Sequence, residues 1–240
     1  ELMQRRLLAL DTGTVTMVVD GVETRDPSFG LPARWIPEGN RAEAEARGWM
    51  VVDSGAVLST HLMETLKGHA AELLGRQDVQ EMIDTLKVTQ PALVDEVVPA
   101  RVSLSLVHRV LQRLLKERVP IRDLVTILEA MADHADTAKD PESLTEYVRR
   151  AMGHVIAEPY TDAAGVLRGI TIGPRLEAAL MGFFSPRART GEPLGPQALS
   201  EALRSLDTLS RDLNSSGQTT PLITPPSLRV GVRRLLEPVL

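Results

Sequence analysis

The stretch WMVVDSGAVLSTHLMETLKGHAAELLG, residues 49–75, joins two kinds of predicted structure. Its first five residues are a mostly apolar run of strand length. From Ser54 onward the apolar residues recur about every 3.6 positions, which predicts an amphipathic helix that ends at Gly75. These apolar positions share one face of the helix: Val57, Leu58, Leu62, Leu66, Ala70 and Leu73. The chain therefore changes at residue 54 from a mixed α/β region to a helical one.

The residues before this stretch predict a small mixed α/β unit. RRLLALD (residues 5–11) and TVTMVVD (residues 14–20) could each be a short strand, and an Asp-Gly turn signal follows the second. Asn40 is placed to cap a short helix, RAEAEARG (residues 41–48), which its glycine stops. The predicted strand at residues 49–53 then closes a strand-helix-strand unit.

The segment RDPSFGLPARWI, residues 25–36, is interpreted as a loop, because its prolines and glycine are too irregular for a helix or strand. It carries Phe29 and Trp35, in a chain with only 3 Phe and 2 Trp. Aromatic residues in loops usually pack beneath the loop, and we expect this of Trp35. Phe29 lies between two small residues and follows Asp26 and Pro27. A half-exposed ring beside a carboxylate is the outline of a docking site.

The residues after Gly75 predict a region made of helices. Apolar residues recur with helical spacing in successive segments, which Pro91, Pro99 and Pro120 separate. DPESLTEYVRRAMGHVI, residues 140–156, predicts a further helix, because Asp140 can be its N-cap with a proline at the first helical position. The middle third of the chain is therefore expected to be an all-α unit.

The last third of the chain predicts mixed structure again. Two strand-like segments, residues 166–172 and 221–224, are separated by helical patterns, and a parallel pair of strands bridged by helices suits this order. Helices are predicted at residues 175–183, 197–213 and 227–240, with a loop at 185–196. The predicted fold class is α+β with several subdomains: a small mixed α/β unit, a central all-α helical subdomain and a C-terminal α/β subdomain.

Composition excludes several kinds of partner. The chain has 240 residues, 43% of them hydrophobic, and a net charge of −5, so we expect no nucleic-acid partner. It has no cysteine, which removes disulfides and thiolate metal sites. No apolar run approaches the roughly 18 residues of a spanning helix, and we expect no membrane contact by this chain.

The sequence also lacks the usual signatures of catalysis. Its five histidines show no metal-binding spacing, and no P-loop, dinucleotide-binding or nucleophile-elbow motif occurs. We therefore expect no catalytic residue, no metal and no cofactor. His61 beside Thr60 is the one suggestive acid–base pairing, and an enzyme with an unrecognised site near His61 is a remote alternative.

KERVPIRD, residues 116–123, places charged residues around a proline between two apolar helices. One interpretation is a charged corner in which Asp123 accepts hydrogen bonds near a helix N-terminus. The other is a subunit interface through Arg118, Arg122 and Asp123, because arginines in a rigid corner suit bidentate pairing across an interface. The residues alone favour the two interpretations about equally.

Several ordered blocks of the sequence resemble the C-terminal cytoplasmic domain of the type III protein export gate family. They include RDPSFGLPARWI, PALVDEVVP, GPRLEAAL and most of residues 48–84 and 110–153. LLGRQDVQ, ERVPIRDLVTILE and DPESLTEYVR make the flagellar branch the closer match, with the injectisome branch as second choice. The resemblance covers nearly the whole chain.

The resemblance implies a docking platform and not an enzyme. In this family the cytoplasmic domain follows a membrane region, assembles into a nine-membered ring below the export gate and receives chaperone-bound substrates. The implied partners are export chaperone–substrate complexes, other export apparatus proteins and further copies of the chain. The implied location is the cytoplasmic face of the bacterial inner membrane.

The resemblance also divides the chain into subdomains. Residues 1–53 match the family's second subdomain, residues 54–73 a helix of the largely absent first, residues 74–153 the helical third and residues 154–240 the fourth. The match begins inside the family's cytoplasmic domain and stops short of its final strand. We therefore expect the chain to be a truncated part of a longer protein.

The family's chaperone-binding dimple provides the candidate site. It uses the Asp and Phe of a D-P-x-F motif and the Thr of a T-H-L motif, which match Asp26, Phe29 and Thr60. The resemblance implies that Phe29 is exposed for an apolar side chain of a partner, with Asp26 and Thr60 giving polar orientation beside it. Ring contacts in the family also favour the interface interpretation of the charged corner at residues 116–123.

Overall fold

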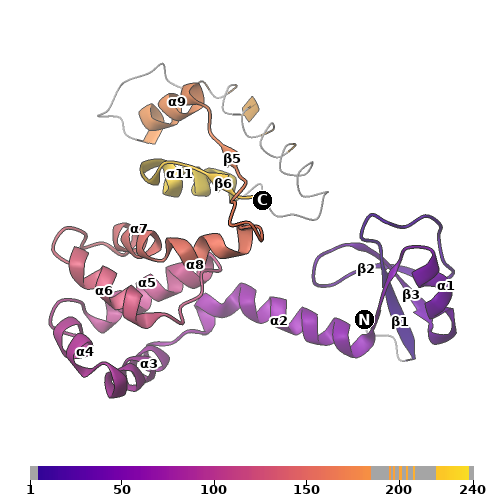
Figure 1. Ribbon diagram of the computed structural model, residues 1–240, viewed down its shortest axis with the longest axis horizontal. Helices are drawn as coiled ribbons and strands as arrows, with labels where there is room; N and C mark the ends of the chain where they lie inside the picture. The colour runs from indigo at the N-terminus through magenta and orange to yellow at the C-terminus, as the bar shows by residue number, and fades with distance from the viewer. Residues whose placement is uncertain are drawn as a thin grey trace. The chain divides into compact units, whose positions relative to one another are not determined.

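The computed structural model describes residues 5–184 and 220–237, and between these ranges residues 195, 197, 200, 201, 204 and 208. The chain divides into two compact units, Glu1–Ala151 and Met152–Leu240. Figure 1 labels most of the helices and strands of both units. The finer division into four subdomains stays a prediction.

The first unit begins with a four-stranded antiparallel sheet in the order β2-β3-β1-β4. The strands are β1 (Arg6–Leu10), β2 (Val22–Arg25), β3 (Pro32–Pro37) and β4 (Met50–Asp53). The short helices η1 (Glu38–Asn40) and α1 (Arg41–Ala46) lead from β3 to β4. The predicted strands near residues 5–11 and 49–53, and the predicted helix after Asn40, are confirmed.

Two predictions for this region are wrong. Residues 14–20 form no strand, because side chains near α1 bind their carbonyl groups: Trp49 Nε1 donates to the Met17 oxygen at 2.9 Å and Arg47 Nη1 to the Val18 oxygen at 2.7 Å. Residues 32–36 are not loop but strand, since β3 forms hydrogen bonds with a strand on each side. A proline is tolerated at the first position of a strand, so Pro32 does not prevent this pairing.

Both faces of the sheet contribute to the core, as the two-residue period of a strand requires. The first face packs under α1 and forms one cluster: Leu7, Ala9, Val19, Ile36, Ala44 and Trp49. The opposite face packs against the start of α2 (Ser54–Leu73) and forms a second cluster: Leu8, Leu10, Ala33, Trp35 and Val57. The predicted burial of Trp35 is confirmed, although it lies in a strand and not in a loop.

Helix α2 begins where the sequence predicts, because the Asp53 carboxylate caps it by accepting the amide of Ala56 at 2.8 Å. It ends at Leu73, two residues before Gly75. Only Val57 of the predicted apolar face is buried, and the four leucines of that face are exposed: Leu58, Leu62, Leu66 and Leu73. The reason is that α2 contacts the sheet at its start and α5 toward its end, and neither contact covers this face.

The rest of the first unit is helical, which confirms the predicted all-α region. Its helices are α3 (Arg76–Thr89), α4 (Pro91–Val97), α5 (Leu104–Lys116), α6 (Leu124–His134) and α7 (Pro141–Ala151). The large side chains at the centre of this core are fully buried: Leu111, Leu114, Ile127, Leu128, Met131 and Leu144. The prediction of one helix over residues 140–156 is wrong, because the backbone leaves helical geometry at Met152 (ψ 14°) before α8 (Gly153–Ala157) begins.

The second unit contains α8, η2 (Glu158–Tyr160), β5 (Ile170–Thr171), α9 (Pro174–Phe184), β6 (Leu222–Ile223) and α11 (Pro226–Leu236). β5 and β6 are parallel, as the sequence predicts, but β5 is shorter than the predicted strand at 166–172. Leu180 of α9 packs with three residues of α11: Leu228, Val232 and Leu236. The predicted loop at 185–196 and helix at 197–213 lie largely outside the described residues.

The α+β fold class predicted from the sequence is confirmed. In the ranges that the structure describes, none of the helices combines the length and apolar character needed to cross a bilayer.

Candidate functional site

The connection between β2 and β3, residues 26–31, is a short loop organised by Asp26. The carboxylate Oδ2 of Asp26 accepts the amides of Ser28 at 3.1 Å and Phe29 at 2.7 Å. The Asp26 carbonyl accepts the amide of Gly30 at 2.9 Å, and the Asp26 amide donates to the Leu31 carbonyl at 2.9 Å. Asp26 thus binds the loop at several points through its backbone and its side chain.

The loop leaves Phe29 exposed and Asp26 buried. The Phe29 residue is 63% exposed, whereas Asp26 is 5% exposed. Gly30 adopts a left-handed backbone conformation (φ 68°), which glycine tolerates without steric cost and which turns the chain back toward β3. Arg25 Nη1 donates to the Gly30 carbonyl at 2.9 Å and closes the loop from the side of β2. The exposed ring of Phe29 therefore lies on a loop whose backbone is held by several hydrogen bonds.

Thr60, the third residue of the candidate site, lies on α2 in the same compact unit. It is half-buried and follows the buried Val57 by three residues, about one helical turn. In the part of the chain that the structure describes, no hydrogen bond joins Thr60 to the 26–31 loop. The structure thus brings Asp26 and Phe29 together on one loop and places Thr60 on α2, which packs against β1 and β4 of the same unit.

The charged corner at residues 116–123 makes the local hydrogen bonds of the first interpretation. Asp123 is the N-cap of α6, where its carboxylate accepts the amide of Thr126 at 3.1 Å and its hydroxyl at 2.7 Å. Arg118, in a left-handed conformation (φ 57°), forms an ion pair with Glu64 at 3.1 Å. Arg122 is exposed. These intramolecular bonds fit the first interpretation and do not test the second. The subunit interface through Arg118, Arg122 and Asp123 therefore stays a prediction.

Glu64 of α2 binds the charged corner through its ion pair with Arg118. A hydrogen bond from Lys67, and then one from Arg118, lower the pKa of the Glu64 carboxyl below its ordinary value. The carboxylate form is therefore favoured, and Arg118 retains a charged partner on α2 at neutral pH.

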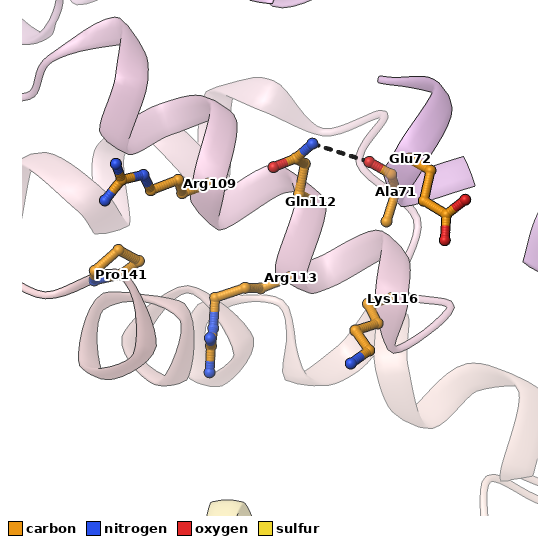
Figure 2. Close-up of a pocket in the computed structure, with 7 residues that line it drawn as sticks. All are labelled: Ala71, Glu72, Arg109, Gln112, Arg113, Lys116 and Pro141. Atoms are coloured by element: carbon orange, nitrogen blue, oxygen red, sulfur yellow. Dashed lines mark hydrogen bonds between the residues drawn. The ribbon is translucent and has the colours of Figure 1, made fainter. Parts of the chain in front are cut away.

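Sequence reasoning missed a basic groove beside α5, which Figure 2 shows in close-up. Its volume is about 360 Å³, and its lining residues come from α2, α5 and the first turn of α7: Ala71, Glu72, Arg109, Gln112, Arg113, Lys116 and Pro141. In Figure 2 the side chains of Arg113 and Lys116 extend in the same direction from α5. The spacing of Arg109, Arg113 and Lys116 at i, i+4 and i+7 was the available signal, because it places all three cations on one helix face.

Two side chains of α5 bind the backbone at the end of α2, beside the groove. Gln112 Nε2 donates to the Ala71 carbonyl at 3.0 Å, and His108 Nε2 lies 2.8 Å from the Leu74 carbonyl. Arg113 forms an ion pair with Glu142 of α7 at 3.0 Å. The groove is thus part of the junction between α2, α5 and α7.

His61, the centre of the remote enzymatic alternative, is exposed on α2, where its carbonyl accepts the hydroxyl of Thr65 at 2.8 Å. Over residues 5–184 and 220–237 and the described positions between them, no group of three or more His, Asp or Glu side chains is arranged to hold a metal ion.

Comparison with protein families and curated proteins gives consistent matches over the chain. The FHIPEP family matches residues 1–240. The chain is 38% identical to the flagellar biosynthesis protein FlhA of Bacillus subtilis over 238 residues, which are 99% of the chain and 35% of that protein. It is 40% identical to FlhA of Escherichia coli over 176 residues, which are 73% of the chain and 25% of that protein. The chain spans about a third or less of the length of these relatives.

Several solved structures share this fold, among them the nonameric EscV cytosolic domain from the type III secretion system. The CdsV protein of Chlamydia pneumoniae superposes with a TM-score of 0.81 and 25% identity, covering 100% of this chain and 69% of that one. CdsV in its complex with CdsO superposes with a TM-score of 0.78 and 26% identity, covering 99% and 70%. The nonameric SctV-C of enteropathogenic E. coli (EPEC) has a TM-score of 0.67 and 21% identity, covering 94% and 75%, and shares the fold.

Proposed function

Because this chain belongs to the FHIPEP family of flagellar and type III secretion export gates, we propose that it is a cytoplasmic docking platform for chaperone-bound export substrates. Phe29, Asp26 and Thr60 form the docking site in this proposal. The observation that carries it is the 63% exposure of Phe29 on a loop whose own hydrogen bonds hold it in place. A rigid, exposed aromatic ring is the kind of group that anchors protein interfaces.

A single exposed ring on the loop suits a partner that must bind and then be released. Phe29 is one isolated large ring on the loop, between the small residues Ser28 and Gly30. A single apolar anchor favours a small and transient interface over a permanent one. Such reversible binding is what a transport platform requires, since each cargo must leave before the next one docks.

Titration of a purified export chaperone–cargo complex against the protein tests this proposal. Phe29→Ala should weaken binding about 30-fold, because a central aromatic anchor contributes about 2 kcal/mol or more. Thr60→Ala should weaken binding by a smaller factor. Phe183→Ala is the matched control, because Phe183 is also an exposed ring (53%) but lies in the second unit. If wild type and Phe29→Ala bind with equal affinity and the variant is folded, the docking site does not lie on this loop.

The second part of the proposal is assembly into a ring of nine copies at the cytoplasmic face of the bacterial inner membrane, in contact with other export apparatus proteins. The nonameric structures of proteins with this fold support it. A closed ring needs two different complementary surfaces on each copy. We assign Arg118, Arg122 and Asp123 to one of them, with Arg122 as the residue most available to a neighbour because it is exposed.

Sedimentation velocity of the protein tests the ring surface. Arg122→Glu should shift the protein from the ring to smaller species, since it reverses a charge at the interface. Arg76→Glu is the matched control, because Arg76 is an exposed arginine at the start of α3. A ring that survives Arg122→Glu unchanged would exclude this surface.

The family is one of protein export and not a known class of enzyme. The curated relatives at 38–40% identity are flagellar biosynthesis proteins, whereas the CdsV protein is 25–26% identical. The identities to the flagellar relatives support the flagellar branch in our proposal, with the injectisome branch as the alternative.

A further inference from the structure

We propose that Asp26 is a positioning residue of the docking site: its carboxylate holds the 26–31 loop so that Phe29 faces the partner, and it does not itself contact the partner. This inference rests on the proposed docking function. It differs from the expectation that Asp26 provides a polar contact beside Phe29.

The burial of Asp26 is the first argument. Asp26 is 5% exposed and is one of only two buried polar residues, with Thr145, in the described part of the chain. A carboxylate is rarely buried unless hydrogen bonds compensate for its lost hydration. A side chain this covered presents almost no surface to a second protein.

The hydrogen bonds of the carboxylate are the second argument. Asp26 Oδ2 accepts two amides of its own loop, from Ser28 at 3.1 Å and from Phe29 at 2.7 Å. Aspartate in this role makes a turn by replacing a backbone acceptor with its side chain, two or three residues before the donors. The lone pairs of Oδ2 are therefore already used to shape the loop.

The direction of Phe29 follows from these bonds. The Phe29 amide points inward to the Asp26 carboxylate, and the residue is 63% exposed. The next residue, Gly30, returns its amide to the Asp26 carbonyl at 2.9 Å. With both amides bound to Asp26, the loop presents the ring in a restricted range of orientations. Preorganisation of this kind raises affinity by lowering the ordering cost of binding.

The experiment compares Asp26→Asn with Asp26→Ala. Asparagine keeps a side-chain oxygen at the same distance and serves almost as well as aspartate in such turns and caps, but it carries no charge. Alanine removes the acceptor altogether. Two quantities are measured for each variant: the affinity for a purified export chaperone–cargo complex and the hydrogen-exchange rate of the Phe29 amide. Fluorescence of the buried Trp35 confirms that the sheet remains folded.

The positioning role predicts a separation between the two variants. Asp26→Asn should bind within about threefold of wild type and keep the Phe29 amide protected. Asp26→Ala should bind about tenfold more weakly, with faster exchange of the Phe29 amide, since tenfold corresponds to about 1.4 kcal/mol, within the range of about 0.5–2 kcal/mol that losing a cap of this kind costs. If alanine prevents folding, the asparagine variant still decides the question.

A direct ionic contact predicts a different pattern, which would overturn the inference. Asp26→Asn would then bind as weakly as Asp26→Ala while its Phe29 amide stayed protected. Unchanged exchange in Asp26→Ala would also overturn it, because the carboxylate would not be holding the loop. Failure of the docking proposal itself is recognised separately: Phe29→Ala would then leave affinity unchanged, whereas the exchange rates still report whether Asp26 holds the loop.

Discussion

Replacement of Gly48 by alanine should destabilise the sheet of the first unit strongly. Gly48 has a φ of 86°, in the left-handed region, and an added Cβ would lie 2.2 Å from the Thr14 carbonyl oxygen. The same two residues are joined by a hydrogen bond from the Thr14 hydroxyl to the Gly48 carbonyl at 2.9 Å. The methyl group would therefore have to push residues 14–19 away from the end of α1.

The size of the effect follows from three contributions. A left-handed conformation costs a residue with a Cβ about 1–2 kcal/mol. Displacement of backbone in a packed site costs about 1–3 kcal/mol, as other overpacked sites do. The lower entropy of an unfolded chain with alanine returns about 0.4–1 kcal/mol. The free energy of unfolding should thus fall by about 3 kcal/mol.

Two matched glycines separate these contributions. Gly39 has no positive φ and no atom within 4 Å of an added Cβ, so Gly39→Ala should leave the sheet as stable or stabilise it by about 0.5 kcal/mol. Gly30 has a φ of 68° but open space around it, so Gly30→Ala should show the conformational cost alone, about 1 kcal/mol. The expected order of stability is Gly39→Ala, then Gly30→Ala, then Gly48→Ala.

Urea unfolding followed by tryptophan fluorescence measures this order in the correct part of the chain. The chain has 2 Trp residues, Trp35 and Trp49, and both are buried in the sheet clusters. Their fluorescence therefore reports the sheet even when the second unit unfolds separately. Equal midpoints for Gly48→Ala and Gly39→Ala would refute the clash with Thr14.

Two further predictions concern the helical part of the first unit. Leu111→Ala and Leu128→Ala should each lower the free energy of unfolding by about 2–5 kcal/mol, because both leucines are fully buried. Leu58→Ala is the control and should cost much less, because Leu58 is exposed. Thermal melts followed by circular dichroism compare the three variants, and equal melting temperatures would contradict the assigned core. Hydrogen bonds from Ser143, the backbone amide first, lower the pKa of Asp140 below 3.8 in the folded protein. Asp140 therefore stabilises α7 above pH 3.8, and this stabilisation is lost as the pH falls through the lower folded pKa. Serine can still cap the helix, but it has no carboxyl group that titrates. Acid unfolding followed by circular dichroism should therefore show that Asp140→Ser loses less stability than wild type as the pH falls below 3.8. The same loss of stability in both proteins would refute the role of Asp140.

Local signals were sufficient where a residue acts on its own neighbours. Asp53 caps α2, Pro91 opens α4 and Asp140 accepts the amide of Ser143 at the start of α7. The start of α2 at residue 54, the boundary at Pro91 and the cap at Asp140 were predicted from residue type and spacing, whereas the cap by Asp53 was not.

Local signals failed where pairing decided the outcome. Residues 32–36 look irregular in sequence, yet they form the strand β3 because β1 and β2 supply hydrogen bonds on both sides. Residues 14–20 look like a strand, yet Arg47 and Trp49 take the carbonyl groups that a strand would need. In both cases at least one deciding partner is distant in the chain, β1 for β3 and residues 47–49 for residues 14–20, and tertiary contacts override propensity.

The candidate site shows the same division. Order and spacing of residues are enough to show that Phe29 and Asp26 share one short loop, that helices follow residue 54 and that the chain belongs to an export-gate family. The packing of distant segments, by contrast, buries Asp26 while leaving Phe29 exposed, and it places Arg109, Arg113 and Lys116 along an open groove bordered by α2 and α7. Burial depends on which distant segments cover a side chain, and no local pattern contains that information.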